Sequence, residues 1–143
     1  MIKENKNVLN IAFATSNERD LDEHFGSCQQ FIIYRLSLEN KEHINTIKFT
    51  AYEGHNQQKI SDRLTVLEDC FAVYCLACGN PVRKLLLEQG TRVVIHPHIE
   101  SIDKILSKVQ ANWPGKIALR QARQINKKQD DDYFNKLADS EWG

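Results

Sequence analysis

The chain has 143 residues, 41% of them hydrophobic and 27% charged, with a formal net charge of zero and a sequence pI of about 7.0. These values are those of an ordinary globular protein with a hydrophobic core, so they exclude disorder throughout, and the neutral balance gives no support for binding to nucleic acid or to a membrane surface. No apolar run approaches the roughly 20 residues that a bilayer-spanning helix needs and residues 1–7 are polar, so we expect a cytoplasmic protein whose four cysteines stay reduced.

The first half of the chain predicts strands. Residues 8–14 alternate large apolar side chains with small or polar ones, which is typical of a strand, and a polar loop follows at residues 17–27. Two further strand-like runs cover residues 31–38 and 43–51, and the short polar break at 39–41 suits a hairpin. We therefore expect an antiparallel meander of three strands.

The next segments predict a helix and a strand buried on both faces. Ile60, Leu64 and Leu67 recur at helical spacing, which favours an amphipathic helix. Residues 71–76 form a continuous apolar run, the pattern of a strand that is covered on both sides.

A second helix is marked at both ends. Asn80 is a good N-cap, Pro81 suits the first helical position and Gly90 fits just past the end, so residues 81–89 are predicted to be helical. Residues 91–96 then predict another buried strand.

The last core element is a helix that Ser101 caps and residues 113–115 end, with one apolar stripe made of Ile102, Ile105, Leu106 and Val109. The element order is thus three strands, helix, strand, helix, strand, helix. It predicts an α/β fold with a mixed five-stranded sheet and helices on both faces. Residues 1–115 are expected to form a single domain, and residues 116–143 a polar tail that is helical or partly disordered.

The candidate site lies where strands end. If the first strand is parallel to residues 71–76, then residues 15–16, the loop around His24 and residues 75–80 meet at one edge of the sheet. The helix that begins at Pro81 would direct free N–H groups to this edge, and Arg19 and Arg83 could add positive charge, which favours an anionic ligand. Imidazole and thiolate together prefer zinc, iron or an iron–sulfur assembly.

Each candidate residue also has a purely structural interpretation. His24 can hydrogen-bond within its own loop, Phe25 can fill the core, and Gly26 is expected to meet a backbone need such as a positive φ. Cys28 and Cys75 can be small buried hydrophobic residues.

Other thiols and imidazoles leave alternatives open. The Cys75 and Cys78 pair has the spacing of a thiol redox or zinc half-site, so a redox or zinc protein is the alternative function. Cys70 is expected to be structural. His96 and His98 flank Pro97 at the end of the last strand, where they can also face the candidate edge. A two-metal nuclease is disfavoured, because the first strand carries no carboxylate.

Three segments in this order resemble one known family. They are residues 11–16, residues 22–28 with 31–34, and residues 72–77 with Gly79. Together they are similar to the dinitrogenase iron-molybdenum cofactor biosynthesis family, which includes NifX, NafY and the carboxyl-terminal domain of NifB, and the likeness is greatest to NifX and NafY. The resemblance covers about two thirds of the chain.

The resemblance implies a ribonuclease H-like fold and a protein that binds and releases cargo rather than an enzyme. The cargo would be an iron–sulfur cluster precursor or the iron-molybdenum cofactor, carried between the cofactor assembly scaffold and apo-dinitrogenase. The family's cofactor-binding histidine falls on His24 and its strand-end cysteine on Cys75, and Cys28 matches a cysteine of some members. Cys78 and Asn80 depart from the usual pattern, which leaves any role of Cys78 open.

The sequence therefore predicts His24 and Cys75 as metal ligands and no catalytic residue. The full set of predicted cofactor-binding residues is His24, Cys28, Cys75, Ser16, Phe25, Gly26, Gly79 and Arg19.

Overall fold

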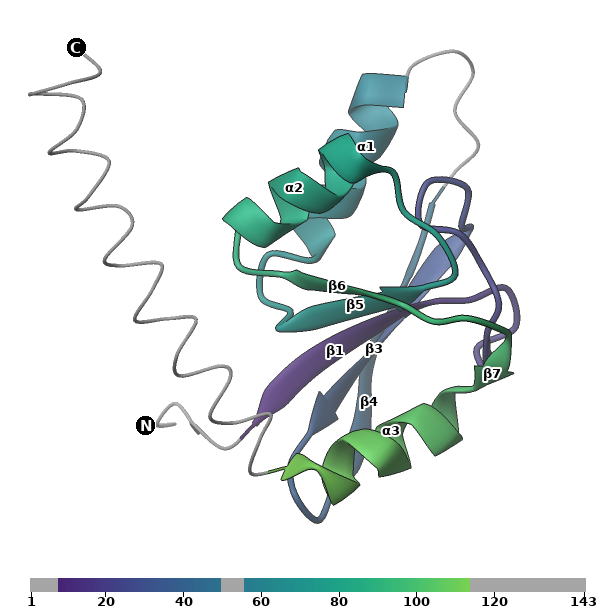
Figure 1. The fold of residues 1–143 in the computed structure, drawn as a ribbon, viewed down its shortest axis with the longest axis vertical. Helices are drawn as coiled ribbons and strands as arrows, with labels where there is room; N and C mark the ends of the chain where they lie inside the picture. Colours follow the sequence, from purple (N-terminus) through teal and green to yellow (C-terminus); the bar gives the residue numbers. More distant parts are fainter. Residues whose placement is uncertain (1–7, 50–55, 114–143) are drawn as a thin grey trace, which may run out of the picture. The chain divides into compact units, whose positions relative to one another are not determined.

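A computed structural model describes residues 8–49 and 56–113 of the chain (Figure 1). The predicted tail at residues 116–143 and the end of the predicted strand at 43–51 lie outside these residues. The strands are β1 (Leu9–Ala14), β2 (Asp20–Leu21), β3 (Gln30–Leu36), β4 (Lys41–Lys48), β5 (Ala72–Cys75), β6 (Arg92–Ile95) and β7 (Glu100–Ser101). The helices are α1 (Asn56–Val66), α2 (Asn80–Glu88) and α3 (Ile102–Ala111).

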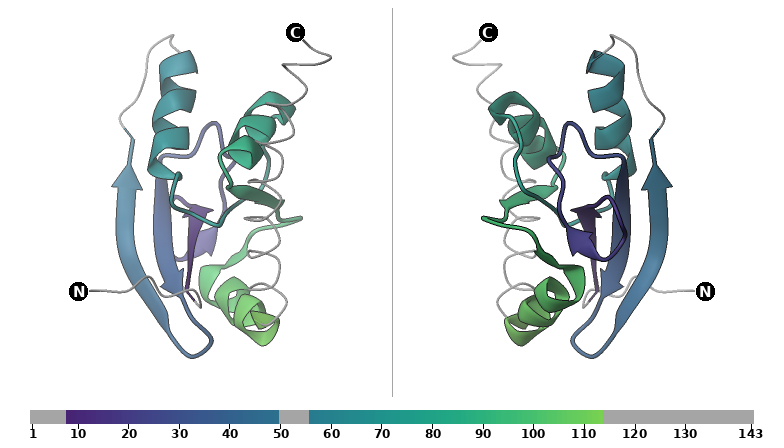
Figure 2. Two further views of the ribbon diagram at one scale, coloured as in Figure 1. Left: turned by 90° about the vertical axis from the view of Figure 1, so that its left-hand side faces the viewer. Right: turned by 90° about the vertical axis from the view of Figure 1, so that its right-hand side faces the viewer.

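The mixed five-stranded sheet predicted from the element order is confirmed, with the strand order β4-β3-β1-β5-β6. β1 pairs antiparallel with β3 and parallel with β5, and β5 pairs parallel with β6. The side views in Figure 2 show the β3–β4 hairpin at one side of the sheet and β6 with α2 at the other. β1 and β5 are thus central, and both are almost wholly buried.

Helices cover both faces of the sheet, as predicted. Figure 1 shows α1 and α2 over one face and α3 over the other. On the first face, alternate residues of β1, β3 and β5, among them Ala14, Phe31 and Cys75, form a core with Leu67 and Leu86. The stripe predicted for α3 is buried in full. Among the described helices, none combines the length and apolar character that a bilayer crossing requires.

Two details of the prediction are wrong. The strand at residues 92–95 is only partly buried, because β6 pairs with a single neighbour among the described strands and leaves Arg92 and Ile95 exposed. The N-cap of α2 is Gly79 rather than Asn80: its carbonyl oxygen accepts the Arg83 N–H at 2.9 Å, so the helix begins one residue earlier.

The end of α2 follows the sequence closely. Gly90 adopts φ 94°, a conformation that glycine reaches without a steric penalty. Its N–H donates to the Leu87 carbonyl oxygen at 3.0 Å, and the Thr91 N–H donates to the Leu86 carbonyl oxygen at 2.9 Å. These are the two hydrogen bonds of a Schellman motif, which ends the helix and turns the chain into β6.

A second, two-stranded sheet was not predicted. Asp20 pairs with Ser101 and Leu21 pairs with Glu100, so β2 and β7 join the loop after β1 to the start of α3. The Ile102 N–H also donates to the Arg19 carbonyl oxygen at 2.9 Å. The loop that carries His24 is therefore fixed at its beginning by a segment about 80 residues away along the sequence.

Candidate functional site

The loop after β1 is joined to the segment after β5 by two backbone hydrogen bonds. The Phe25 N–H donates to the Ala77 carbonyl oxygen at 2.8 Å, and the Leu76 N–H donates to the Glu23 carbonyl oxygen at 2.9 Å. Because β1 and β5 are parallel neighbours, both segments leave the sheet at the same edge. The backbone of His24 therefore lies beside the segment that carries two of the cysteines.

His24 and Gly26 are both exposed in this loop motif, as is Ser27. The expectation that Gly26 needs a positive φ is wrong, since Gly90 is the glycine that adopts one in the described part of the chain. A Cβ atom added at Gly26 would meet nothing within 4 Å. The space beside Gly26, two residues after His24, is therefore open.

The neighbours of these two residues point inward. Phe25 is 1% exposed, and its ring centroid lies 5.4 Å from that of Phe31. Cys28 is also buried, and its thiol donates to the Phe25 carbonyl oxygen at 3.3 Å. Both residues thus pack in the core, which is the structural alternative that the sequence leaves open for them.

A buried arginine holds the loop from within the protein. Arg63 of α1 is 2% exposed, its Nε donates to the Phe25 carbonyl oxygen at 3.3 Å, and its Nη2 donates to the Cys28 carbonyl oxygen. Its guanidinium carbon lies 4.1 Å from the centroid of the Phe49 ring, a cation–π contact. Arg63 thus satisfies two carbonyl groups of the turn that follows His24.

Arg63 is not among the residues predicted from the sequence. It lies three positions after Ile60 and four before Leu67, within the apolar stripe of α1. Arginine is almost never fully buried unless it is paired, so a charged residue in a buried stripe is the signal that could have revealed it.

Three of the cysteines lie close enough to influence one another. The Cys75 thiol is fully buried, and its hydrogen bond to Cys78, its burial and the nearby Cys28 thiol all raise its pKa. Cys78 is half-buried, and the hydrogen bond from Cys75, together with the charge of Arg83, lowers its pKa in spite of desolvation. Cys78 therefore carries the most readily formed thiolate of the pair.

Cys70 is a structural residue, as expected. It is 4% exposed, and burial, with a smaller effect of Asp69, raises the pKa of its thiol to about 12.

The remaining polar groups of the edge are fixed within the loop or positively charged. Ser16 donates its N–H to Asp22 Oδ1 at 2.8 Å and its hydroxyl to Oδ2 of the same carboxylate. α2 begins at Asn80, two residues after Cys78, so the positive end of the helix lies close to Cys78 along the chain. The edge thus combines an exposed imidazole, an ionisable thiol and a local positive potential.

Comparison with known proteins identifies the chain's relatives. The family described as dinitrogenase iron-molybdenum cofactor matches residues 7–112, most of the chain. The chain belongs to this family. It is 30% identical over 143 residues to the protein NifX of Klebsiella pneumoniae, which covers 99% of this chain and 89% of that protein. It is 33% identical over 88 residues to NifX of Azotobacter vinelandii, covering 61% of this chain and 56% of that protein.

A solved structure agrees in fold. The crystal structure of PH0822 superposes with a TM-score of 0.59 at 15% identity, covering 73% of this chain and 90% of that chain. Membership of the dinitrogenase iron-molybdenum cofactor family therefore associates this chain with nitrogen fixation and with iron-molybdenum cofactor biosynthesis.

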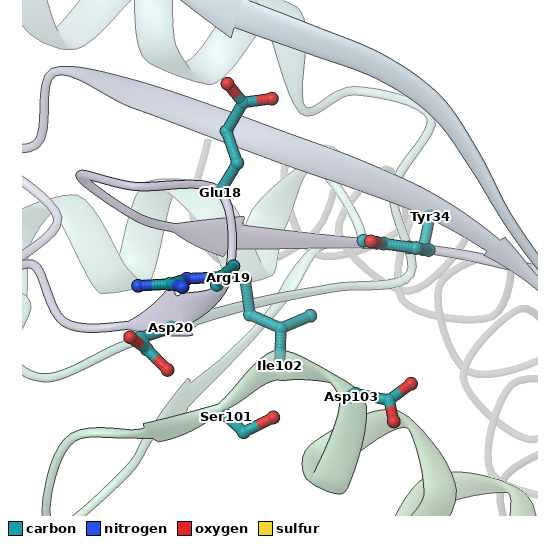
Figure 3. Close-up of a pocket in the computed structure, with 7 residues that line it drawn as sticks. All are labelled: Glu18, Arg19, Asp20, Tyr34, Ser101, Ile102 and Asp103. Carbon is teal, nitrogen blue, oxygen red and sulfur yellow. The ribbon is translucent and has the colours of Figure 1, made fainter.

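One of the predicted cofactor-binding residues, Arg19, lies outside this edge. Arg19 lines an open pocket of about 560 Å³ between the β1–β2 loop and the start of α3, where Figure 3 shows it with Glu18, Asp20, Tyr34 and Asp103. Burial raises the pKa of Tyr34, and so do the nearby carboxylates of Asp103 and Glu18. The positive charge of Lys41 lowers it in part. None of the predicted metal ligands lines this pocket.

The structure thus brings together all of the predicted cofactor-binding residues except Arg19. The residues that share the edge are Ser16, His24, Phe25, Gly26, Cys28, Cys75 and Gly79.

Alkylation should distinguish the four thiols of this family member. We expect iodoacetamide to modify Cys78 first, with a pH midpoint below that of free cysteine, because its lowered pKa provides thiolate at lower pH. The measurement is mass spectrometry of peptides after timed labelling from pH 6 to 9. Cys78→Ser protein should label much more slowly, and equal labelling of Cys70 and Cys78 in the native protein would contradict the assignment.

Proposed function

We propose that this chain binds an iron–sulfur cofactor precursor or the finished iron-molybdenum cofactor and passes it from the cofactor assembly scaffold to apo-dinitrogenase. Membership of the family and the similarity to two NifX proteins support this role. The chain acts by binding and release in the cytoplasm and performs no chemical turnover on its cargo.

The observation that carries the proposal is the exposed His24 imidazole on a backbone fixed by hydrogen bonds. The Phe25 N–H and the Glu23 carbonyl on either side of His24 are both bonded to the segment after β5. Imidazole is a ligand that iron accepts, and open space at Gly26 gives a large cluster access. A single neutral ligand of this kind holds a cluster and still lets a partner's ligand displace it.

Local charge complements the anionic cargo. Arg83 and the first turn of α2 lie beside Cys78, so they stabilise a negatively charged cluster at this edge. The Cys75 sulfur is fully buried and hydrogen-bonded to Cys78. We therefore assign Cys75 a role through Cys78, whose pKa its hydrogen bond lowers, and we retain direct ligation by Cys75 as a prediction.

We also propose that the fold is ribonuclease H-like. The three-stranded antiparallel part β4-β3-β1 continues into the parallel strands β5 and β6, which are connected by α2. This order supports a ribonuclease H-like sheet.

Replacement of His24 tests the proposal. His24→Ala protein, incubated anaerobically with isolated iron-molybdenum cofactor, should bind it at least about 10-fold more weakly, because the only exposed imidazole of the β1–β2 and β2–β3 loops is lost. The measurement is iron retained per protein after gel filtration, together with visible absorbance.

His43→Ala is the matched control. His43 is exposed on β4 and contacts Thr46 with Nε2 at 2.7 Å, away from the edge. It should bind cofactor like the unaltered protein. Equal retention of iron by the His24→Ala and His43→Ala proteins would reject His24 as the ligand.

A further inference from the structure

A second group of potential ligands lies between β6 and α3. We propose that His96, His98 and Glu100 bind a divalent first-row transition metal ion such as Zn²⁺, separately from the cofactor cargo. One ligand atom from each of the three residues can be chosen so that all lie within 4.8 Å of one another. Two imidazoles and one carboxylate are a ligand set that such ions accept, with coordination positions left for water.

The ring nitrogens are already oriented for this role. His96 Nδ1 lies 2.8 Å from the His98 carbonyl oxygen, and His98 Nδ1 lies 3.0 Å from the Ile99 carbonyl oxygen. A carbonyl oxygen only accepts hydrogen bonds, so Nδ1 is the donor in each ring and Nε2 is the ring nitrogen left to bind a metal ion. Histidines that bind metals in proteins are commonly held by the same kind of second hydrogen bond.

The distances suit a metal ion. His96 Nε2 lies 2.9 Å from Glu100 Oε2. With metal–ligand distances of about 2.0–2.2 Å, two ligand atoms in one coordination shell stand roughly 2.9–3.4 Å apart. An ion can therefore be bound by both atoms with little movement of either side chain. His98 has an exposed side chain, so its imidazole is free to move toward the other two ligand atoms.

The Glu100 carboxylate already has a partner, Lys108, that a metal ion can displace. Lys108 Nζ lies 3.4 Å from both oxygens of Glu100, and the Lys108 side chain is 69% exposed. This long contact keeps the carboxylate in place and leaves lone pairs of both oxygens available to a metal ion.

The backbone on both sides of the three residues is fixed. The His96 N–H donates to the Cys75 carbonyl oxygen at 2.9 Å, and Glu100 pairs with Leu21 in the β2–β7 sheet. The ligands thus extend from a short segment held at both ends, so binding requires little ordering of the chain.

Metal titration of the full chain tests the site. We expect Zn²⁺ to bind with a stoichiometry of one per chain by calorimetry under reducing conditions, with at least about 10- to 100-fold weaker binding in His98→Ala and Glu100→Gln proteins. His43→Ala, a histidine variant outside the site, should bind Zn²⁺ normally. His24→Ala should also bind normally, which separates this result from the cofactor proposal.

Co²⁺ provides a second measurement that identifies the ligands. Bound by imidazole and carboxylate, it should show only d–d absorption, whereas thiolate ligation would add a sulfur-to-metal charge-transfer band. A charge-transfer band would assign the ion to the cysteines and overturn the proposal. So would undiminished Zn²⁺ binding in both site variants, or an equal loss in His43→Ala protein.

Discussion

Arg63→Ala protein should be less stable than the unaltered protein by about 3 kcal/mol, because two buried carbonyl groups lose a charged donor at roughly 1–3 kcal/mol each. The groups are the carbonyls of Phe25 and Cys28, and the contact with the Phe49 ring disappears as well. Loss of the arginine's own desolvation offsets part of the effect. Urea unfolding, followed by circular dichroism and extrapolated linearly to water, measures the difference.

Two further variants separate hydrogen bonding from packing at this position. Arg63→Met keeps most of the side-chain volume, so its loss should be smaller than that of Arg63→Ala but should still exceed about 1 kcal/mol. Arg83→Met removes an exposed arginine from α2 and should stay within about 0.5 kcal/mol. An Arg63→Met protein as stable as Arg83→Met would show that the two hydrogen bonds contribute nothing to the fold.

Phe25→Ala should have the largest effect of any substitution in the loop motif, a loss of about 3–5 kcal/mol in the free energy of unfolding. Phe25 is 1% exposed and packs on Phe31 beneath the loop, so truncation leaves a cavity next to Cys28 and Cys75. Thermal unfolding of the reduced protein measures the effect.

Two control variants accompany Phe25→Ala: a conservative substitution at the same position and a truncation of an exposed side chain elsewhere. Phe25→Leu keeps part of the volume and should lose no more than about half as much as Phe25→Ala. Leu87→Ala truncates a 61% exposed side chain of α2 and should be nearly neutral. If Phe25→Ala matched Leu87→Ala in stability, Phe25 would be a surface contact and not a core residue.

Strand alternation and apolar runs were sufficient to predict the five-stranded sheet, because the side chains of β1, β3 and β5 report their own burial. The pairing of β2 with β7 was not predictable from the same reasoning. Each strand has two residues, and Asp20, Leu21, Glu100 and Ser101 show no alternation of their own. Such short strands are defined by backbone pairing, which leaves little mark on side-chain pattern.

The location of the site was predictable from the sequence, but the burial of its individual side chains was not. The sequence placed the His24 loop and the cysteine segment at one edge, because the ends of parallel strands meet there. It did not predict that Cys75 would be fully buried while Cys78 stays half-buried. Cys75 is the last residue of the buried strand β5, whereas Cys78 follows residues 76–77, whose backbone is hydrogen-bonded to Glu23 and Phe25.

The two-stranded β2–β7 sheet restricts the backbone on one side of His24. The β2–β7 pairing fixes the backbone just before His24, and Arg63 fixes it just after His24. The backbone between these two points is therefore restrained against outward movement. Only torsions within the imidazole side chain remain free. In the function proposed above, the rate of cluster transfer would then be set by the incoming ligand atom of the recipient, in an associative exchange, and not by a slow opening of this chain.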